Sequence, residues 1–288
     1  MGKNSASDQV IGVQREWAER AGLKVDDRGY LATLDENLCQ PLSSGALAAF
    51  DQGNGSELQD RGTSPAKMRA LHSSSALAVN VFDYWTEGDC TPLTAALEIG
   101  DAANPPVFEK KFPTGLPGNP PNLDVVLTLK SGVTFAVESK FTEWLTPKSG
   151  ARPSFKEKYF ESDEGVWRNV GLSECQSLAQ DVQRGTERFM HLDAPQLLKH
   201  ALGLAKQTGR DFSLCYLYFD WSCPESDIHR HEVDRFASRV SGEVRFRSVS
   251  YQDLVSRLRR TCGPEHEAYL EYLLGRYFGK AAPTPAVS

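Results

Sequence analysis

Apolar and polar side chains alternate between residues 122 and 141, and this pattern predicts two paired β-strands. The alternation runs through 123–129 and 133–141, with Lys130-Ser131-Gly132 between the two segments. A three-residue loop with Gly132 in the left-handed conformation would pair Leu129 with Val133. The same register places Asp124 directly opposite Glu138.

This register sorts the side chains of the predicted hairpin onto two faces. One face is almost wholly apolar, and the other carries all of the charged groups. A two-residue loop would shift the register by one and place Asp124 among valines, so burial and chemistry favour the same pairing. The apolar face collects Leu123, Val125, Leu127, Leu129, Val133, Phe135, Val137, Ser139 and Phe141, and the other face collects Asp124, Val126, Thr128, Thr134, Ala136, Glu138 and Lys140.

Periodicity and capping residues predict further helices and strands on both sides of the hairpin. From Thr91 to Phe219 the expected order is helix, three strands, helix and strand, which indicates an α/β fold. Residues 1–63 are interpreted as an accessory region, 64–280 as the main domain with its core at about 91–220, and 281–288 as a disordered tail. The other elements expected are a helix at 10–21, helices beginning at Ser64-Pro65 and Thr91-Pro92, a strand at 107–112, a helix at 195–207, a strand at 212–219, a helix at 227–240, a strand at 244–249, and helices at 252–260 and 265–278.

Composition narrows the class of protein. The chain has 288 residues, of which 40% are hydrophobic, and no stretch approaches the roughly 20 apolar residues that cross a bilayer. Six cysteines without a C-x-x-C pair indicate reduced thiols, so we expect a cytoplasmic protein with no membrane partner. A net charge of −6 argues against a protein that coats nucleic acid electrostatically, although it allows a local basic groove.

The charged face of the hairpin has the residue types of a metal-dependent hydrolase. Opposed carboxylates on a partly buried sheet either share a proton or bind a cation. Mg²⁺ takes oxygen ligands and keeps waters, which suits Asp124 and Glu138 together with a substrate phosphate oxygen, and Mn²⁺ should substitute for it. Lys140 lies on the same face, where it can orient or deprotonate the attacking water and offset charge at phosphorus. The implied reaction is hydrolysis of a phosphodiester.

A Glu-x-Lys triplet is common enough to occur by chance, and the chain contains a second one at Glu109-Lys110-Lys111. The alternative for Glu138 and Lys140 is an ion pair on a solvent-facing edge hairpin. The strongly apolar opposite face favours a central strand pair instead. For Glu109 the surface interpretation is favoured, because no partner aspartate is expected in register on a following strand.

These residues resemble a known superfamily. Pro121-Asn122-Leu123-Asp124 and Glu138-Ser139-Lys140 are similar to the two halves of the PD-(D/E)XK nuclease motif, with the proline three positions before the aspartate. The sequences around 67–80, 112–116, 136–143 and 192–200 resemble a bacterial family described as restriction endonucleases, over roughly residues 64 to 220. The resemblance implies a mixed central sheet flanked by helices, with 64–280 as the nuclease domain. It also implies metal binding by Asp124, Glu138 and the Ser139 carbonyl, with Lys140 as the catalytic lysine.

Further residues are candidates for supporting roles. Some members of the superfamily carry an extra acid on the first core helix, which here is Glu98; a solvated helix end is the alternative. Gln196 and Lys199 share the polar stripe of the 195–207 helix and could contact a phosphate or orient Lys140. Basic and aromatic residues alternate after the second hairpin strand, which suits phosphate contacts and base stacking; a solvated insertion is the alternative. The basic candidates for substrate binding are Lys148, Arg152, Lys156 and Lys158.

The sequence therefore predicts a Mg²⁺-dependent endonuclease that cuts DNA in restriction or another defence role. Two alternatives stay open: a structure-specific nuclease of repair or recombination, and a nucleic-acid-binding protein that keeps the fold without cutting. Cutting both strands usually requires two active centres, so a homodimer is plausible.

Overall fold

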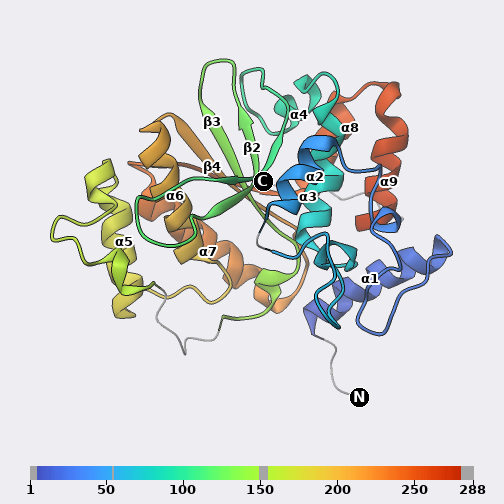
Figure 1. The fold of residues 1–288 in the computed structure, drawn as a ribbon, viewed down its shortest axis with the longest axis horizontal. Coiled ribbons are helices and arrows are strands. Elements are labelled where there is room, and N and C mark those ends of the chain that lie inside the picture. Colours follow the sequence, from blue (N-terminus) through green and yellow to red (C-terminus); the bar gives the residue numbers. More distant parts are fainter. Residues whose placement is uncertain (1–4, 54, 149–154, 280–288) are drawn as a thin grey trace.

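The structure is a computed structural model that describes residues 5–53, 55–148 and 155–279. Its centre is one mixed sheet in the order β1-β2-β3-β4-β5 (Figure 1). The first three strands pair antiparallel. Strand β4 then pairs parallel with β3, and β5 pairs parallel with β4. The predicted α/β fold with a mixed sheet is confirmed, and the hairpin lies inside the sheet. The strands are β1 (Val107–Lys111), β2 (Asn122–Thr128), β3 (Thr134–Lys140), β4 (Phe212–Tyr218) and β5 (Arg245–Ser250).

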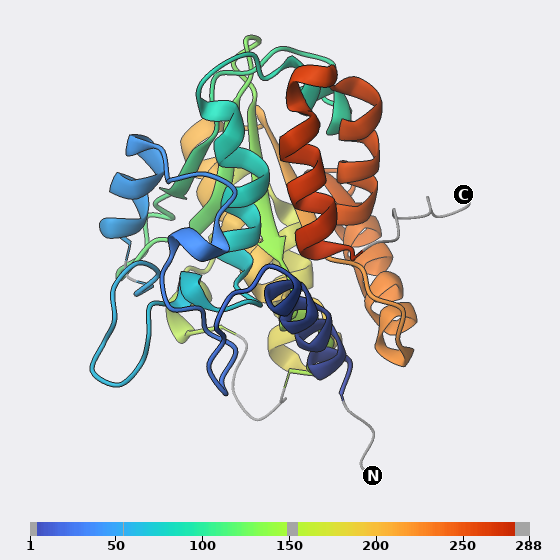
Figure 2. The same cartoon turned by 90° about the vertical axis from the view of Figure 1, so that its right-hand side faces the viewer.

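Helices cover both faces of this sheet (Figure 1). One face carries α5 (Ser173–Arg184), α6 (Ala194–Thr208) and α7 (Pro224–Val240). The opposite face carries α2 (Ser44–Asp51), α3 (Ser74–Phe82), α4 (Thr91–Ala96), α8 (Tyr251–Thr261) and α9 (Glu267–Tyr277). The N-terminal helix α1 (Ala6–Arg20) contacts α9, which runs beside α8 (Figure 2).

The hairpin has the predicted register. Val125 pairs with Val137 and Thr128 with Thr134, and the Leu129 N–H donates to the Val133 carbonyl at 2.9 Å. Gly132 closes the loop with φ +90°, a conformation that a side chain would strain. The interpretation of the loop from its length is therefore confirmed.

Side chains of the hairpin enter two cores, one on each face of the sheet. Val125, Leu127 and Val137 pack beneath α3 and α8, whereas Val126 and Ala136 pack beneath α6. A strand with parallel neighbours is normally covered on both faces, which explains why the charged face is buried as well. The predicted place of Leu123 on the first face is wrong, because Leu123 packs in the core beneath α6.

Several element boundaries differ from those predicted. Helix α1 begins at Ala6, because Ser5 and Asp8 form a capping box one turn before the expected start. Ser64-Pro65 does not begin an α-helix: Ser64 forms a bridge with Arg61, a short 3-10 helix follows at Lys67–Arg69, and the next α-helix, α3, is capped by Ser73. Helices α2 and α5 were not expected. The other predicted helices and strands are present, with ends shifted by a few residues.

Part of the predicted accessory region packs on the rest of the chain. Helix α2 contacts β1, and the rings of Phe50 and Phe108 lie 5.7 Å apart. The buried guanidinium of Arg276 in α9 donates to Gln14, and to Asn37 at 2.7 Å. The division at residue 63 stays a prediction, and the predicted tail at 281–288 lies outside the described residues. No helix in the described part of the chain combines the length and apolar character needed to span a membrane.

Candidate active site

Asp124 occupies a place in the sheet where the regular ladder stops. The β2–β3 pairing ends at Val125 and Val137, and one step further the Asp124 Oδ2 accepts a hydrogen bond from the Ser139 N–H at 2.6 Å. A side-chain oxygen thus takes the position that a backbone carbonyl would hold in a continued ladder. The alternation of β2 changes at this point, which accounts for the place of Leu123. The Asp124 carboxylate is thereby anchored beside β3.

Glu138 lies next to Asp124 and is almost completely buried, with 1% of its surface exposed. Its Oε1 is ion-paired with Lys140 Nζ, two residues further along β3. Its Oε2 lies 2.8 Å from Nε2 of His200, a buried residue of α6. The Glu138 carboxylate is therefore ion-paired with Lys140 at one oxygen and in close contact with the His200 ring at the other, a contact that lacks hydrogen-bond geometry. The three predicted catalytic residues lie together.

The electrostatics of the site follow from this crowding. Burial raises the pKa of Asp124 well above its usual range, and the neighbouring charge of Glu138 raises it further. Burial would also raise the pKa of Glu138, but Lys140 and His200 outweigh it and hold that pKa below its usual value. Burial would lower the pKa of Lys140, yet the two carboxylates raise it. Glu138 is thus the anionic partner of a protonated Lys140, and Asp124 is the carboxyl that most readily holds a proton.

Ser139 can add a third oxygen to this pair of carboxylates. The Lys140 carbonyl accepts from Phe219 N–H on the β4 side, so the backbone groups of Ser139 point to the β2 side, where Asp124 lies. The Ser139 hydroxyl points elsewhere, to the hydroxyl of Tyr251 in α8 at 2.6 Å. Within the described ranges no group of three or more His, Cys, Asp and Glu side chains could hold a metal ion. An ion here would take its remaining ligands from backbone, water and substrate oxygens.

Glu109 lies closer to the site than its interpretation as a surface residue implied. In the β1–β2 ladder Phe108 pairs with Val125 and Lys110 pairs with Leu123. Glu109 therefore lies opposite Asp124. Burial raises the pKa of Glu109, a hydrogen bond from Asn122 opposes this, and Glu57 and Glu138 raise it further. Glu109 also has φ +50°, an uncommon backbone conformation for a residue with a side chain. The expectation that no aspartate would face Glu109 in register is therefore wrong.

A small cavity opens beside Lys140. It is lined by Lys140, Glu143, Trp144, Lys148, His191, Asp193 and Tyr216. The segment before α6 is held in place by the buried carboxylate of Glu232, which accepts backbone N–H groups of Met190, His191 and Leu192 at 2.6 to 2.9 Å. Charged acceptors of several N–H groups are strong anchors. The wall of the cavity that carries Asp193 is thus fixed to α7.

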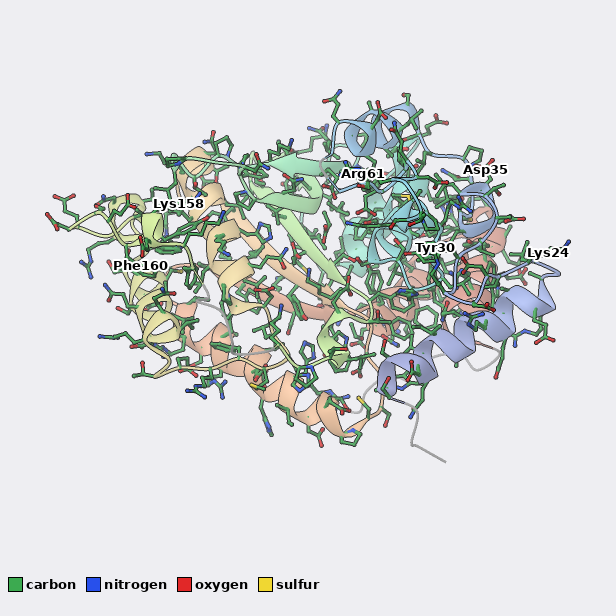
Figure 3. The ribbon with its side chains drawn as sticks, turned by 60° about the horizontal axis from the view of Figure 1, so that its bottom comes forward. Lys24, Tyr30, Asp35, Arg61, Lys158 and Phe160 are labelled. Carbon is green, nitrogen blue, oxygen red and sulfur yellow. The ribbon has the colours of Figure 1, made fainter. Side chains whose placement is uncertain are left out.

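The charges of the predicted substrate-binding lysines act on Lys199 of α6. Burial lowers the pKa of Lys199, Asp193 opposes this, and the charges of Lys148, Lys156 and Lys158 lower the pKa further. Lys199 therefore belongs to a group of basic side chains, Lys148, Lys156, Lys158 and Lys199, which we call the lysine cluster. Figure 3 shows Lys158 at the end of the molecule opposite Lys24.

Three of the aromatic rings near the lysine cluster do not fit the expected base stacking. Phe155, Tyr159 and Trp167 are buried and pack against one another, with Tyr159 and Trp167 stacked at 5.6 Å. Lys199 Nζ lies over the ring of Phe155 at 5.3 Å. These rings pack against one another and against Lys199, so their faces are not open to a base.

Glu98 is exposed and ion-paired with Arg257 of α8 at 3.3 Å, so the structure does not bring it to the Asp124 carboxylate. Gln196 donates its backbone N–H to the Asp193 cap of α6 at 3.0 Å, and the role expected of its side chain stays a prediction. Arg152 lies outside the described residues.

His200 is a contact of Glu138 that the sequence pattern did not predict. The polar stripe of the helix indicates Gln196 and Lys199, whereas His200 lies on the apolar stripe, three residues after Leu197 and four before Leu204. A histidine at a packing position of an otherwise apolar helix face is the signal that could have found it.

A mixed sheet that brings Asp124 and a Glu-x-Lys triplet together on its central strands defines the class of PD-(D/E)XK nucleases. A protein-family model described as restriction endonuclease associating with ARP matches residues 22–278. The chain belongs to this family, which implies a nuclease. The match starts within the predicted accessory region. Searches of curated proteins and of solved structures found no match.

Proposed function

We propose that this protein is a Mg²⁺-dependent endonuclease that hydrolyses DNA phosphodiester bonds in restriction or another defence role, and that Mn²⁺ can replace Mg²⁺. The observation that carries the proposal is the cluster of Asp124, Glu138 and Lys140 on the central strands. Membership of a restriction endonuclease family supports the same reaction.

The oxygens at this site fit a hard divalent cation. Asp124, Glu138 and the Ser139 carbonyl would hold Mg²⁺, which usually takes one or two carboxylates and leaves other positions to water and phosphate. When bound, the ion would supply Lewis acidity to the scissile phosphate and activate water. The raised pKa of Asp124 supports a need for added positive charge, because burial beside Glu138 disfavours two carboxylate anions.

Lys140 would act as a permanently protonated cation. Its raised pKa keeps the side chain protonated, so it donates hydrogen bonds and offsets charge that develops on the phosphate oxygens. It is 16% exposed and borders the cavity that leads to Lys148. This cavity, of about 10 Å³, has room for no more than a water molecule. A backbone phosphate would therefore bind outside its mouth, between the catalytic cluster and the lysine cluster.

The proposal is tested by incubating the purified protein with linear, circular, single-stranded and branched DNA, in Mg²⁺, in Mn²⁺ and in EDTA. We expect cleavage of duplex DNA with either ion and none in EDTA. Cleavage confined to branched substrates would favour a structure-specific repair or recombination nuclease. Binding without cleavage of any substrate would contradict the proposal in favour of a non-cleaving DNA-binding protein.

The lysine cluster would bind the phosphate backbone, and a double charge reversal tests it. For Lys156→Glu with Lys158→Glu we expect weaker DNA binding at low salt, and a slope of log affinity against log salt smaller by about 2, because each phosphate contact contributes about 0.9. Lys24→Glu with Arg20→Glu makes the same charge change at the opposite end, where Figure 3 places Lys24. Equal affinity of both double variants would remove the lysine cluster from the binding surface.

A further inference from the structure

His200 is a buried polar residue on a helix face that is otherwise apolar. Its neighbours on that face, Leu197 and Leu204, are at most 1% exposed, as is His200 itself. A leucine could fill such a position without burying a polar ring. Neither ring nitrogen of His200 has a hydrogen-bond partner in the part of the chain that the structure describes, although Nε2 lies 2.8 Å from Oε2 of Glu138, at ion-pair distance. Its contact with Glu138 is thus what distinguishes His200 from a packing residue.

The two oxygens of the Glu138 carboxylate are held by groups of different mobility. Lys140 reaches Oε1 through a long, flexible stem on the same strand and is partly exposed. His200 reaches Oε2 from α6, which is packed on the sheet through its apolar face. An incoming cation can therefore displace Lys140 from Oε1 far more easily than it can displace His200 from Oε2.

We propose, on the basis of the function proposed above, that His200 is a positioning residue that restricts Glu138 to one coordinating oxygen and thereby favours Mg²⁺ over Ca²⁺. Mg²⁺ demands near-octahedral geometry, whereas Ca²⁺ accepts more ligands and often takes both oxygens of a carboxylate. When His200 occupies Oε2 of Glu138, only Oε1 is free to coordinate the ion. Partners that orient metal ligands in this way typically change metal affinity by about 10- to 100-fold.

The variants His200→Leu and His200→Gln separate this role from packing. Leucine fills the space but lacks the donor, whereas the glutamine amide can place an N–H near the position of Nε2. Mg²⁺ and Ca²⁺ binding to the full chain are measured by calorimetry and by the metal-induced shift in Tm. We expect Mg²⁺ affinity to fall by about 10- to 100-fold in His200→Leu, with Ca²⁺ binding kept or strengthened, and both affinities to return towards wild type in His200→Gln.

A second comparison covers the case in which the leucine variant does not fold. His200→Asn has the same amide on a stem that is one carbon shorter, so it should not reach Oε2 and should lose Mg²⁺ preference, unlike His200→Gln. Equal Mg²⁺ to Ca²⁺ preference in wild type, His200→Gln and His200→Asn would overturn the role of His200. If wild type itself binds no Mg²⁺ and cuts no DNA, the proposed function fails instead.

Discussion

Lys140→Ala is expected to cut DNA at least about 10²- to 10³-fold more slowly than wild type, the usual loss when one group that stabilises transition-state charge is removed. Lys140 is ion-paired with Glu138 and its charge also acts on Asp124, and its raised pKa keeps it charged throughout the neutral range. DNA binding should survive, because phosphate contacts are assigned to the lysine cluster. Single-turnover cleavage and a separate binding assay without divalent cations measure the two effects.

Two other variants make this result specific. Lys130→Ala removes a lysine from the loop of the same hairpin, where Nζ donates to Asn104 at 2.8 Å, and should cut like wild type. Lys140→Arg keeps the charge with a different geometry and should retain more activity than Lys140→Ala. Wild-type cleavage by Lys140→Ala would show that the reaction does not depend on this side chain.

Asp124→Asn is expected to abolish cleavage and Mg²⁺ binding while leaving the metal-free protein as stable as wild type or more so. The amide can still accept the Ser139 N–H, but it removes a carboxylate whose raised pKa reflects burial beside Glu138. Mg²⁺ should therefore raise the Tm of wild type and leave that of Asp124→Asn unchanged. Thermal melts with and without Mg²⁺ measure the difference.

The same variant has a pH signature. Because the pKa of Asp124 is raised on folding, its contribution to stability is fully present below the unfolded value of about 4 and is lost as pH rises through the folded value. In metal-free buffer the stability of wild type relative to Asp124→Asn should fall with increasing pH above about 4. A constant difference would mean that Asp124 is not perturbed. A Mg²⁺ shift retained in Asp124→Asn would place the ion elsewhere.

The hairpin was predictable because its information is local. Alternating apolar residues and a three-residue loop ending in Gly132 specify the register. A shift of the register by one residue would have buried Asp124 among valines. The Glu-x-Lys spacing then places Glu138 and Lys140 on one face of β3. The prediction at Ser64-Pro65 was wrong. A serine followed by proline is typical of a helix start, but here Ser64 forms a β-bridge with Arg61 instead.

The partners of these residues depend on packing between distant parts of the chain. His200 reaches Glu138 because α6 crosses the face of β3, and Glu109 faces Asp124 because β1 pairs with β2 around an irregular step. Local periodicity says which side of a helix is buried, but not which side chain of another element it will meet. The register of one hairpin can thus be worked out from its residues, whereas the surroundings that set charge and metal preference arise when separate elements pack.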